Sequence, residues 1–161
     1  MKNQIKKMTI AGVFTALVFL LTAYLHIPVG TGYVHIGDAF IYIAASMLPL
    51  PYGLFVGIGG AVLADCLSGF AVWAPASAII KGVAVLFFTR KSKIICVKNI
   101  IAVFLSWIVC IGGYYLYESI ITSNFIVPLA SIGGNVLQCV FSTIAYIIIG
   151  ISIDKIKRSQ K

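Results

Sequence analysis

Long apolar segments, separated by short polar or basic stretches, dominate the chain. Six of them are predicted to be helices, at about 5–25, 38–48, 52–67, 75–89, 100–117 and 125–153. A helix needs about 20 apolar residues to cross a bilayer, so the first is long enough, whereas the second is short and would tilt or stop early. A β-barrel would show alternating segments of about ten residues instead. The pattern predicts an all-α polytopic membrane protein with six transmembrane helices, forming a single domain over residues 1–161.

The composition supports this class. Hydrophobic residues make up 61% of the 161 residues and charged residues 10%, with a mean hydropathy of +1.07. A soluble domain of this size cannot bury that much apolar surface. The four cysteines show neither a CxxC pair nor metal-ligand spacing, so we expect small buried side chains, and no metal or cofactor.

The basic residues fix the expected orientation. Eleven of the twelve lie in three groups at the ends of apolar segments: Lys2, Lys6 and Lys7; Arg90, Lys91, Lys93 and Lys98; Lys155, Lys157, Arg158 and Lys161. Because cytoplasmic loops carry the excess of Lys and Arg, both termini are predicted to be cytoplasmic, with four crossings before Arg90 and two after it. The net charge of +8 therefore indicates a multi-pass membrane protein rather than a nucleic-acid-binding protein. No small-residue cleavage site follows the basic N-terminus, so we expect the first helix to be retained.

The connections follow from the same pattern. Residues 26–37 contain Pro and Gly but neither Lys nor Arg, which predicts an ordered loop on the outer side. The Pro49-Leu50-Pro51 run predicts a tight inner turn. Residues 68–74 would form a second outer loop, and 90–98 the inner loop.

Unusual polar residues are expected to gather in the outer half of the bundle. Asp38 opens the second segment, Asp65 lies roughly 5 Å below the outer end of the third, and Lys81 about 9 Å inside the fourth, at 1.5 Å per residue. Glu118 would close the fifth segment at the outer surface, and Asn135 would lie in the outer half of the sixth. With no such group expected in the inner half, the pattern predicts a cup open to the outside, with its substrate site on that side, rather than a channel.

Each ionisable residue has a purely structural alternative. Asp65 and Lys81 would either neutralise each other or contact a ligand, since ionisable groups inside lipid mark functional sites by default. Asp38 follows Gly37 at a helix start, where it would serve as an N-cap. His35 would be either solvated in its loop or placed against the cup.

The aromatic and amide residues also leave two interpretations open. Trp73 would be a lipid-interface anchor or a lid over a planar ligand, and Tyr114 belongs to an expected interfacial belt with Tyr115 and Tyr117. Asn135 would form a helix–helix hydrogen bond or contact the ligand. Together these considerations give a candidate ligand-binding set: His35, Asp38, Asp65, Trp73, Lys81, Tyr114 and Asn135.

Two stripes of small residues indicate close helix packing. Gly53, Gly57 and Ala61 recur every four residues in the third segment, in register with Asp65. Gly12 and Ala16 in the first segment would pack inside the bundle or form a flat docking face for another membrane subunit.

The sequence contains none of the usual catalytic or nucleotide-binding motifs. A Ser–His nucleophile pair, an HExxH motif and a phosphate-binding P-loop are all missing, so we expect no enzyme activity and no catalytic residues. Active transport would therefore need energy from elsewhere.

Five short runs carry a family resemblance. They are His35-Ile-Gly-Asp38, Leu48-Pro49-Leu50-Pro51-Tyr52-Gly53, Gly57-Ile-Gly-Gly60, Ala64-Asp65 and Ile80-Lys81-Gly82. With the chain length and the six helices, they resemble the substrate-binding S components of energy-coupling factor (ECF) vitamin transporters. The branch they resemble serves pyridoxine and hydroxymethylpyrimidine, with riboflavin carriers more distant. Gly12 and Ala16 stand where the family has an Ala-xxx-Ala motif that contacts the coupling subunit.

The resemblance implies a vitamin-binding subunit of an ABC importer, for pyridoxine or a related small ring, with hydroxymethylpyrimidine, riboflavin or another vitamin precursor as alternatives. It implies as partners a transmembrane coupling subunit and two ATPases. It also implies that the S component topples in the membrane to carry its filled cup inward. Two other classes remain open: an assembly subunit that binds no small molecule, and a stand-alone secondary transporter using Asp65 as proton carrier.

Overall fold

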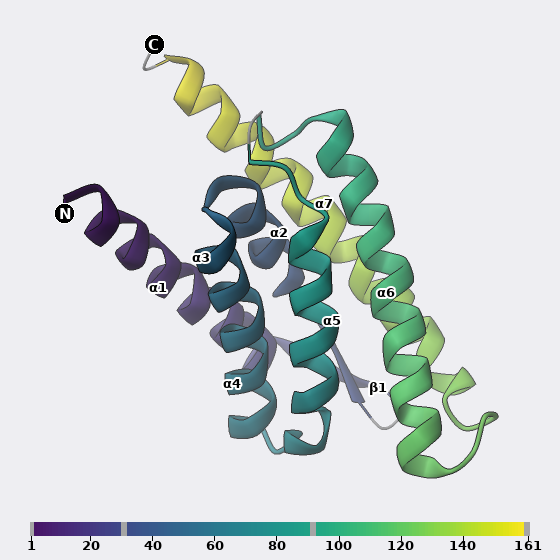
Figure 1. Cartoon of the computed structure of the whole chain (residues 1–161). Helices are drawn as coiled ribbons and strands as arrows, with labels where there is room; N and C mark the ends of the chain where they lie inside the picture. Colours follow the sequence, from purple (N-terminus) through teal and green to yellow (C-terminus); the bar gives the residue numbers. More distant parts are fainter. Residues whose placement is uncertain (1, 30–31, 91–92, 160–161) are drawn as a thin grey trace.

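A computed structural model describes residues 2–29, 32–90 and 93–159, which form helices and one two-stranded hairpin (Figure 1). The elements in chain order are α1 (Lys2–Ala23), β1 (His26–Val29), β2 (Gly32–His35), α2 (Asp38–Met47), α3 (Leu50–Leu54), the π-helical turn η1 (Phe55–Gly59), α4 (Gly60–Leu67), the 3₁₀ turn η2 (Ala71–Trp73), α5 (Ala74–Leu86), α6 (Val97–Thr122) and α7 (Leu129–Ser159).

Six helical segments result within the described residues, because α3, η1 and α4 follow one another without a break. Four stretches are long and apolar enough to cross a membrane: Asn3–Ala23, Leu50–Leu67, Val97–Thr122 and Leu129–Ser159. The helix α2 and the stretch Ala71–Leu86 are apolar but shorter. The predicted all-α class is therefore confirmed, and the four long apolar helices are consistent with a polytopic membrane protein, whereas six crossings and the orientation of the termini stay predictions.

The ordered loop at residues 26–37 is an antiparallel hairpin. His26 pairs with His35 and Val29 with Gly32, so β1 and β2 fold back on each other directly after α1. The hairpin lies toward one end of the bundle, with the α4–α5 and α6–α7 connections (Figure 1). We call this the hairpin end. Both chain ends and the α2–α3 turn lie at the other, which we call the terminal end.

The core is built around α2, which is short but buried on nearly every side. The ring of Tyr42 stacks on Phe88 with centroids 5.2 Å apart and meets Tyr146 edge-on at 6.0 Å. The small residues of α3 and η1 allow close approach, as the sequence predicts. A Cβ added to Gly57 would lie 3.0 Å from Val85 Cγ2 and 3.3 Å from Ile41 Cγ2.

Helix α1 presents two different faces. Toward α4 the packing is tight, since a Cβ at Gly60 would lie only 2.7 Å from Val18. Gly12 and Ala16 are instead exposed, and a Cβ at Gly12 would meet no atom within 4 Å. Packing inside the bundle, one of the two interpretations of this small-residue pair, is therefore wrong.

The terminal end holds a polar network that the sequence analysis did not anticipate. Arg90 donates to the carbonyls of Leu48, Val85 and Phe88, joining the ends of α2 and α5. Asn99 is fully buried and bonds both to the backbone of residue 89 and to that of residue 94. The expectation that buried polar groups occur only in the other half of the bundle is wrong, because backbone groups left open at helix ends need partners there.

The α6–α7 connection also differs from the prediction. Helix α6 continues five residues beyond 117, to Thr122, and ends at Ser123 in the left-handed conformation (φ 50°). Asn124 Oδ1 then accepts from the amides of Ile126 and Val127, and α7 begins only at Leu129. A short Asn turn therefore replaces residues that hydropathy alone assigned to a helix.

Candidate functional site

A cavity lies at the hairpin end, and its empty space, including the open mouth, measures about 560 Å³. Seven elements contribute to its wall: α1, β2, α4, η2, α5, α6 and α7. Six of the seven candidate ligand-binding residues line it: His35, Asp65, Trp73, Lys81, Tyr114 and Asn135. The seventh, Asp38, contacts Lys81 from behind the wall. The structure thus brings the candidate set together, and its ligand-binding role stays a prediction.

Lys81 and Asp38 form a buried ion pair. The Lys81 Nζ lies 2.8 Å from both carboxylate oxygens of Asp38, and Gln138 Nε2 donates to Asp38 Oδ2 at 2.9 Å. Two expectations are therefore wrong. Asp65 does not neutralise Lys81, and Asp38 does not cap α2, since the N-cap residue is Gly37 and no side chain caps that end. The carboxylate of Asp38 turns into the core because a buried ammonium needs a charged partner.

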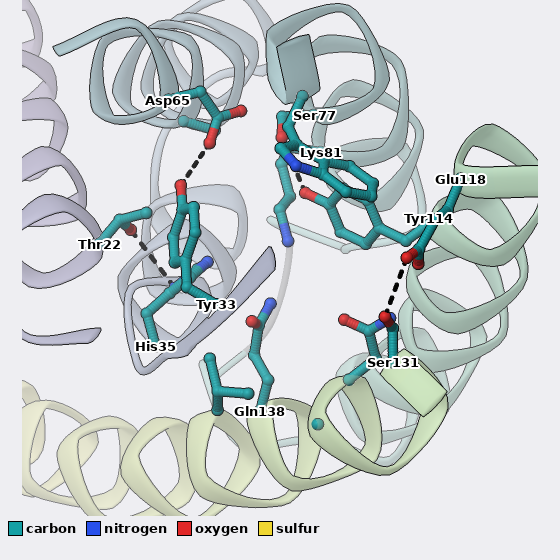
Figure 2. A pocket seen from close by; sticks show the side chains of 15 residues that line it. Thr22, Tyr33, His35, Asp65, Ser77, Lys81, Tyr114, Glu118, Ser131 and Gln138 are labelled. Carbon is teal, nitrogen blue, oxygen red and sulfur yellow. Dashed lines mark hydrogen bonds between the residues drawn. The ribbon is translucent and has the colours of Figure 1, made fainter. Parts of the chain in front are cut away.

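Asp65 has a different partner. Its Oδ1 accepts a hydrogen bond from the hydroxyl of Tyr33, which reaches from β2 to α4 (Figure 2). Its Oδ2 is buried and has no hydrogen-bond partner within the described residues. Burial, and next the negative charge of Asp65, raise the pKa of Tyr33, so this phenol remains a donor. A buried carboxylate oxygen without a donor is costly, which marks this point of the wall for a ligand donor.

His35 is buried in the wall rather than solvated. Its Nδ1 accepts from the amide of Gly37 at 3.1 Å and lies 3.3 Å from Thr22 Oγ1. Burial lowers the pKa of His35 to about 4, an effect that the nearby negative charge of Asp38 only partly opposes. The ring is therefore neutral at pH 7, with its proton on Nε2.

An aromatic wall closes the side formed by η2 and α6. Trp73 is buried and meets Tyr114 at 5.9 Å and Tyr117 at 5.8 Å between ring centroids. Tyr114 bonds Ser77 Oγ at 2.8 Å and lies with its ring centroid 5.3 Å from Lys81 Nζ. A lipid-interface anchor would be exposed, so that interpretation of Trp73 is wrong. The expected belt is also wrong for Tyr114, because its ring lines the cavity.

The opposite part of the wall comes from α6 and α7. Glu118 is 1% exposed and accepts from Ser131 Oγ at 3.2 Å, so its expected position at the surface is wrong. The helix runs on past it to Thr122, which places the carboxylate inside. Asn135 lines the cavity, and its side chain makes no hydrogen bond to the part of the chain that the structure describes. The interpretation of Asn135 as a residue that forms a helix–helix hydrogen bond is therefore wrong for the described part of the chain.

Several lining residues lie outside the candidate set: Thr22, Tyr33, Ser77, Glu118, Ser131 and Gln138. A signal for some of them was present, because Ser131, Asn135 and Gln138 are three or four residues apart and share one face of α7. Figure 2 shows the result, with Tyr33 and Asp65 on one side, Glu118 and Ser131 on the other, and Lys81 and Gln138 between them.

The cysteines divide by location. Cys110 and Cys139 are buried and pack in one small cluster behind the cavity with Ala76 and Ile80. Cys66 is exposed and Cys96 half-buried, so the expectation of burial fails for these two. Their positions near helix ends explain the difference.

Comparison with known proteins identifies one family. The family model described as "ECF-type riboflavin transporter, S component" matches residues 2–155, which is nearly the whole chain. A comparison with curated proteins found no match.

Proposed function

The chain belongs to the ECF-type riboflavin transporter S component family, and from this premise we propose that its cavity captures a single-ring vitamin, pyridoxine. Members of this family are substrate-binding subunits of membrane transporters, not enzymes, so a vitamin-binding role follows from the family itself. The resemblance to ECF S components seen in the sequence is thereby confirmed, whereas the pyridoxine branch is part of the proposal.

The two-sided wall of the cavity is the observation that carries the proposal. Tyr33 lies on one side and Tyr114 on the other (Figure 2), and Trp73 packs against Tyr114, so a flat ring would have aromatic contacts on both faces. The free Asp65 Oδ2 and the Asn135 amide offer hydrogen bonds to ring substituents such as hydroxymethyl arms. Buried polar groups that stay unpaired without the right ligand give strong discrimination.

Riboflavin is the second candidate. The description of the matching family names it. The cavity also extends to Glu118 and Ser131 between α6 and α7, where a hydroxylated chain would find acceptors.

The arrangement of the two ends supports the proposed orientation. The start of α1, which carries Lys6 and Lys7, and the end of α7, which carries Lys155 and Arg158, lie at the terminal end (Figure 1). The cavity lies toward the opposite end. If the basic end is cytoplasmic, as the charge rule predicts, the cavity faces outward in a bacterial cell membrane.

S components associate with an ECF module, and we assign the docking face to α1. Gly12 and Ala16 are exposed and leave a shallow surface on which a helix of the coupling subunit would pack closely. Two ATPases bound to that subunit would supply the energy.

Titration calorimetry of the purified chain against pyridoxine, hydroxymethylpyrimidine and riboflavin tests this function. We expect saturable binding of pyridoxine at a one-to-one ratio. Tighter binding of riboflavin would replace the first candidate by the second. Binding of no B vitamin or precursor would favour the assembly-subunit class. Uptake that survives ATP depletion but stops with a protonophore would indicate a secondary transporter.

A further inference from the structure

The connection between α6 and α7, residues 123–128, presents exposed apolar side chains at the hairpin end (Figure 1). We call it the α6–α7 turn. Phe125 is 70% exposed, Ile126 76% and Val127 43%. Contiguous apolar side chains that stay exposed are typical of interaction sites, because in water they would promote aggregation. The turn therefore needs a cover that comes from outside the chain.

The charged residues around this turn are all turned inward. Over residues 8–89 and 99–153 the sequence has four residues of the types Asp, Glu, Lys and Arg, namely Asp38, Asp65, Lys81 and Glu118. Each of them is at most 3% exposed. Within the part of the chain that the structure describes, the hairpin end thus shows no exposed charge. A protein partner would normally meet a polar rim around the apolar contact, whereas a lipid surface requires none.

The backbone of the α6–α7 turn is closed by hydrogen bonds within the chain. The amides of residues 123 and 124 donate to the carbonyls of residues 120 and 119. Asn124 Oδ1 accepts from the amides of residues 126 and 127, and Pro128 has no amide hydrogen. Among the described residues, the amide of Phe125 alone in this turn has no acceptor. Hydrocarbon excludes open backbone groups, whereas water reaches the headgroup region, so this turn fits the boundary between the two.

The length of α6 places the turn at the same depth. Its 26 residues extend about 39 Å at 1.5 Å per residue, or about 37 Å along the bilayer normal at the usual tilt of about 20°. The hydrocarbon core is about 30 Å thick, and about 40–45 Å with the headgroups. Lys98 is exposed in the first turn of α6 and would hold that end among the headgroups of one leaflet. The end at Thr122 then reaches the headgroup region of the opposite leaflet.

We propose that the α6–α7 turn is an interfacial membrane anchor, with Phe125 and Ile126 inserted at the boundary between the headgroups and the acyl chains of a phospholipid leaflet. Apolar insertion, not charge, would hold it there. Glu118 and Ser131, which line the cavity and bond each other, flank the turn in the chain. The anchor therefore fixes this part of the cavity wall at the membrane surface, whichever vitamin binds.

Fluorescence quenching by brominated lipids tests the depth of the turn. The variant Phe125→Trp is reconstituted in phosphatidylcholine vesicles whose acyl chains carry bromine either near the headgroup or near the chain end. The signal of the unmodified protein, which contains Trp73 and Trp107, is subtracted. We expect the shallow bromines to quench the added indole about twofold more strongly than the deep ones. Quenching by neither lipid would place the turn in water, free for a protein partner, and shallow quenching no stronger than deep quenching would place it in the hydrocarbon. Either result would overturn the proposal.

Two reference variants calibrate the depth scale. Ile108→Trp places the indole near the middle of α6, where Ile108 is 69% exposed, so the deep bromines should quench it more strongly. Ser159→Trp places it at the exposed last residue of α7, at the terminal end, where neither lipid should quench it strongly. The indole of Phe125→Trp should lie between these two references.

A charge at the tip of the turn separates an anchor from a passive neighbour of the bilayer. In the Phe125→Trp background, Ile126→Asp adds a carboxylate that would draw the turn into water, so quenching by the shallow bromines should fall toward the level of Ser159→Trp. Ile126→Leu is the matched control, because it keeps the apolar volume, and it should leave the quenching unchanged. Shallow quenching that is equal in the two double variants would show that apolar insertion does not hold the turn in place, and would overturn the proposal.

Discussion

The Lys81 Nζ lies 2.8 Å from both carboxylate oxygens of Asp38, although 43 positions separate the two residues in the chain. This pair joins α5 to α2, the helix at the centre of the core, and Gln138 joins α7 to the same carboxylate. Three helices therefore meet at one buried charge directly behind the cavity wall. The position of the Lys81 ammonium in the wall is therefore fixed by Asp38 in the absence of a ligand.

Replacing Lys81 tests this relationship through stability. Lys81→Met would leave the Asp38 carboxylate buried with Gln138 alone, and breaking a buried pair costs about 3–5 kcal/mol. We expect a matching fall in the free energy of unfolding, measured by thermal or denaturant unfolding of the purified protein. The double variant Lys81→Met with Asp38→Asn removes both charges and should recover most of that loss.

Asp65 provides the control for the recovery of stability by Asp38→Asn. Asp65 bonds Tyr33 and not Lys81, so Lys81→Met with Asp65→Asn should remain as unstable as the single variant. Rescue by Asp65→Asn rather than by Asp38→Asn would contradict the pairing seen in the structure.

The pairing of Lys81 with Asp38 rather than with Asp65 could not be predicted from the sequence. Depth along a helix follows from counting residues, and it correctly collected Asp65, Lys81 and Asn135 near one end of the bundle. The partner of Lys81 depends on how each helix is rotated about its axis, and hydropathy does not determine that rotation when helices are apolar on most sides. The position of Asp38 at a helix start favours the interpretation as an N-cap. In the structure its carboxylate pairs instead with Lys81, whose buried charge is the stronger partner.

Glu118 shows a second limit. A carboxylate next to several tyrosines is typical of a membrane interface, so the sequence predicts that the helix ends at about residue 117, which is too early. The structure continues α6 to Thr122 and encloses the carboxylate between α6 and α7. The pairing of β1 with β2 could not be predicted from hydrophobic periodicity either, because it depends on contact between two short strands.

Tyr33 is predicted to hold the hairpin to α4. Tyr33→Phe would remove the donor to Asp65 and leave both oxygens of that buried carboxylate without a partner among the described residues. An unsatisfied buried group costs about 1–3 kcal/mol, so the free energy of unfolding without ligand should fall by that amount. Vitamin affinity should also fall, measured by calorimetry.

Tyr24→Phe is the matched control, since Tyr24 is 73% exposed at the end of α1 and loses the same hydroxyl. It should leave stability and affinity unchanged. Equal effects of the two substitutions would show that the Tyr33–Asp65 bond does not hold the hairpin.

His35 is predicted to make stability depend on pH. The folded protein lowers its pKa to about 4, below the ordinary value of about 6.5, so between these values the unfolded chain binds the proton more readily. The free energy of unfolding should therefore fall as pH drops from about 6.5 to about 4, by up to about 3 kcal/mol, and the contribution of His35 should not change further below pH 4.

The variant His35→Gln isolates this contribution from the carboxylates that titrate nearby. It has no group that protonates in this window, so its stability curve should be flatter between pH 4 and 6.5 than that of the unmodified protein. Identical slopes in thermal unfolding series of the two proteins would exclude His35 as the source.

The last prediction concerns the exposed face of α1. Gly12→Trp or Ala16→Trp should abolish vitamin uptake by cells that contain the coupling subunit and ATPases, because a bulky side chain would prevent close helix contact there. Vitamin binding by the isolated protein should be unchanged, since the cavity lies toward the hairpin end. Uptake of radiolabelled vitamin and calorimetry measure the two effects separately.

Two further substitutions decide between docking and packing. Ile108→Trp places the same bulk on α6, where Ile108 is 69% exposed, and should leave uptake intact. Gly60→Ala introduces a Cβ only 2.7 Å from Val18 on the packed face of α1, so it should lower stability first and impair binding and uptake together. If Gly12→Trp behaved like Gly60→Ala, the exposed face of α1 would be part of the bundle's own packing, and the coupling subunit would have to dock elsewhere.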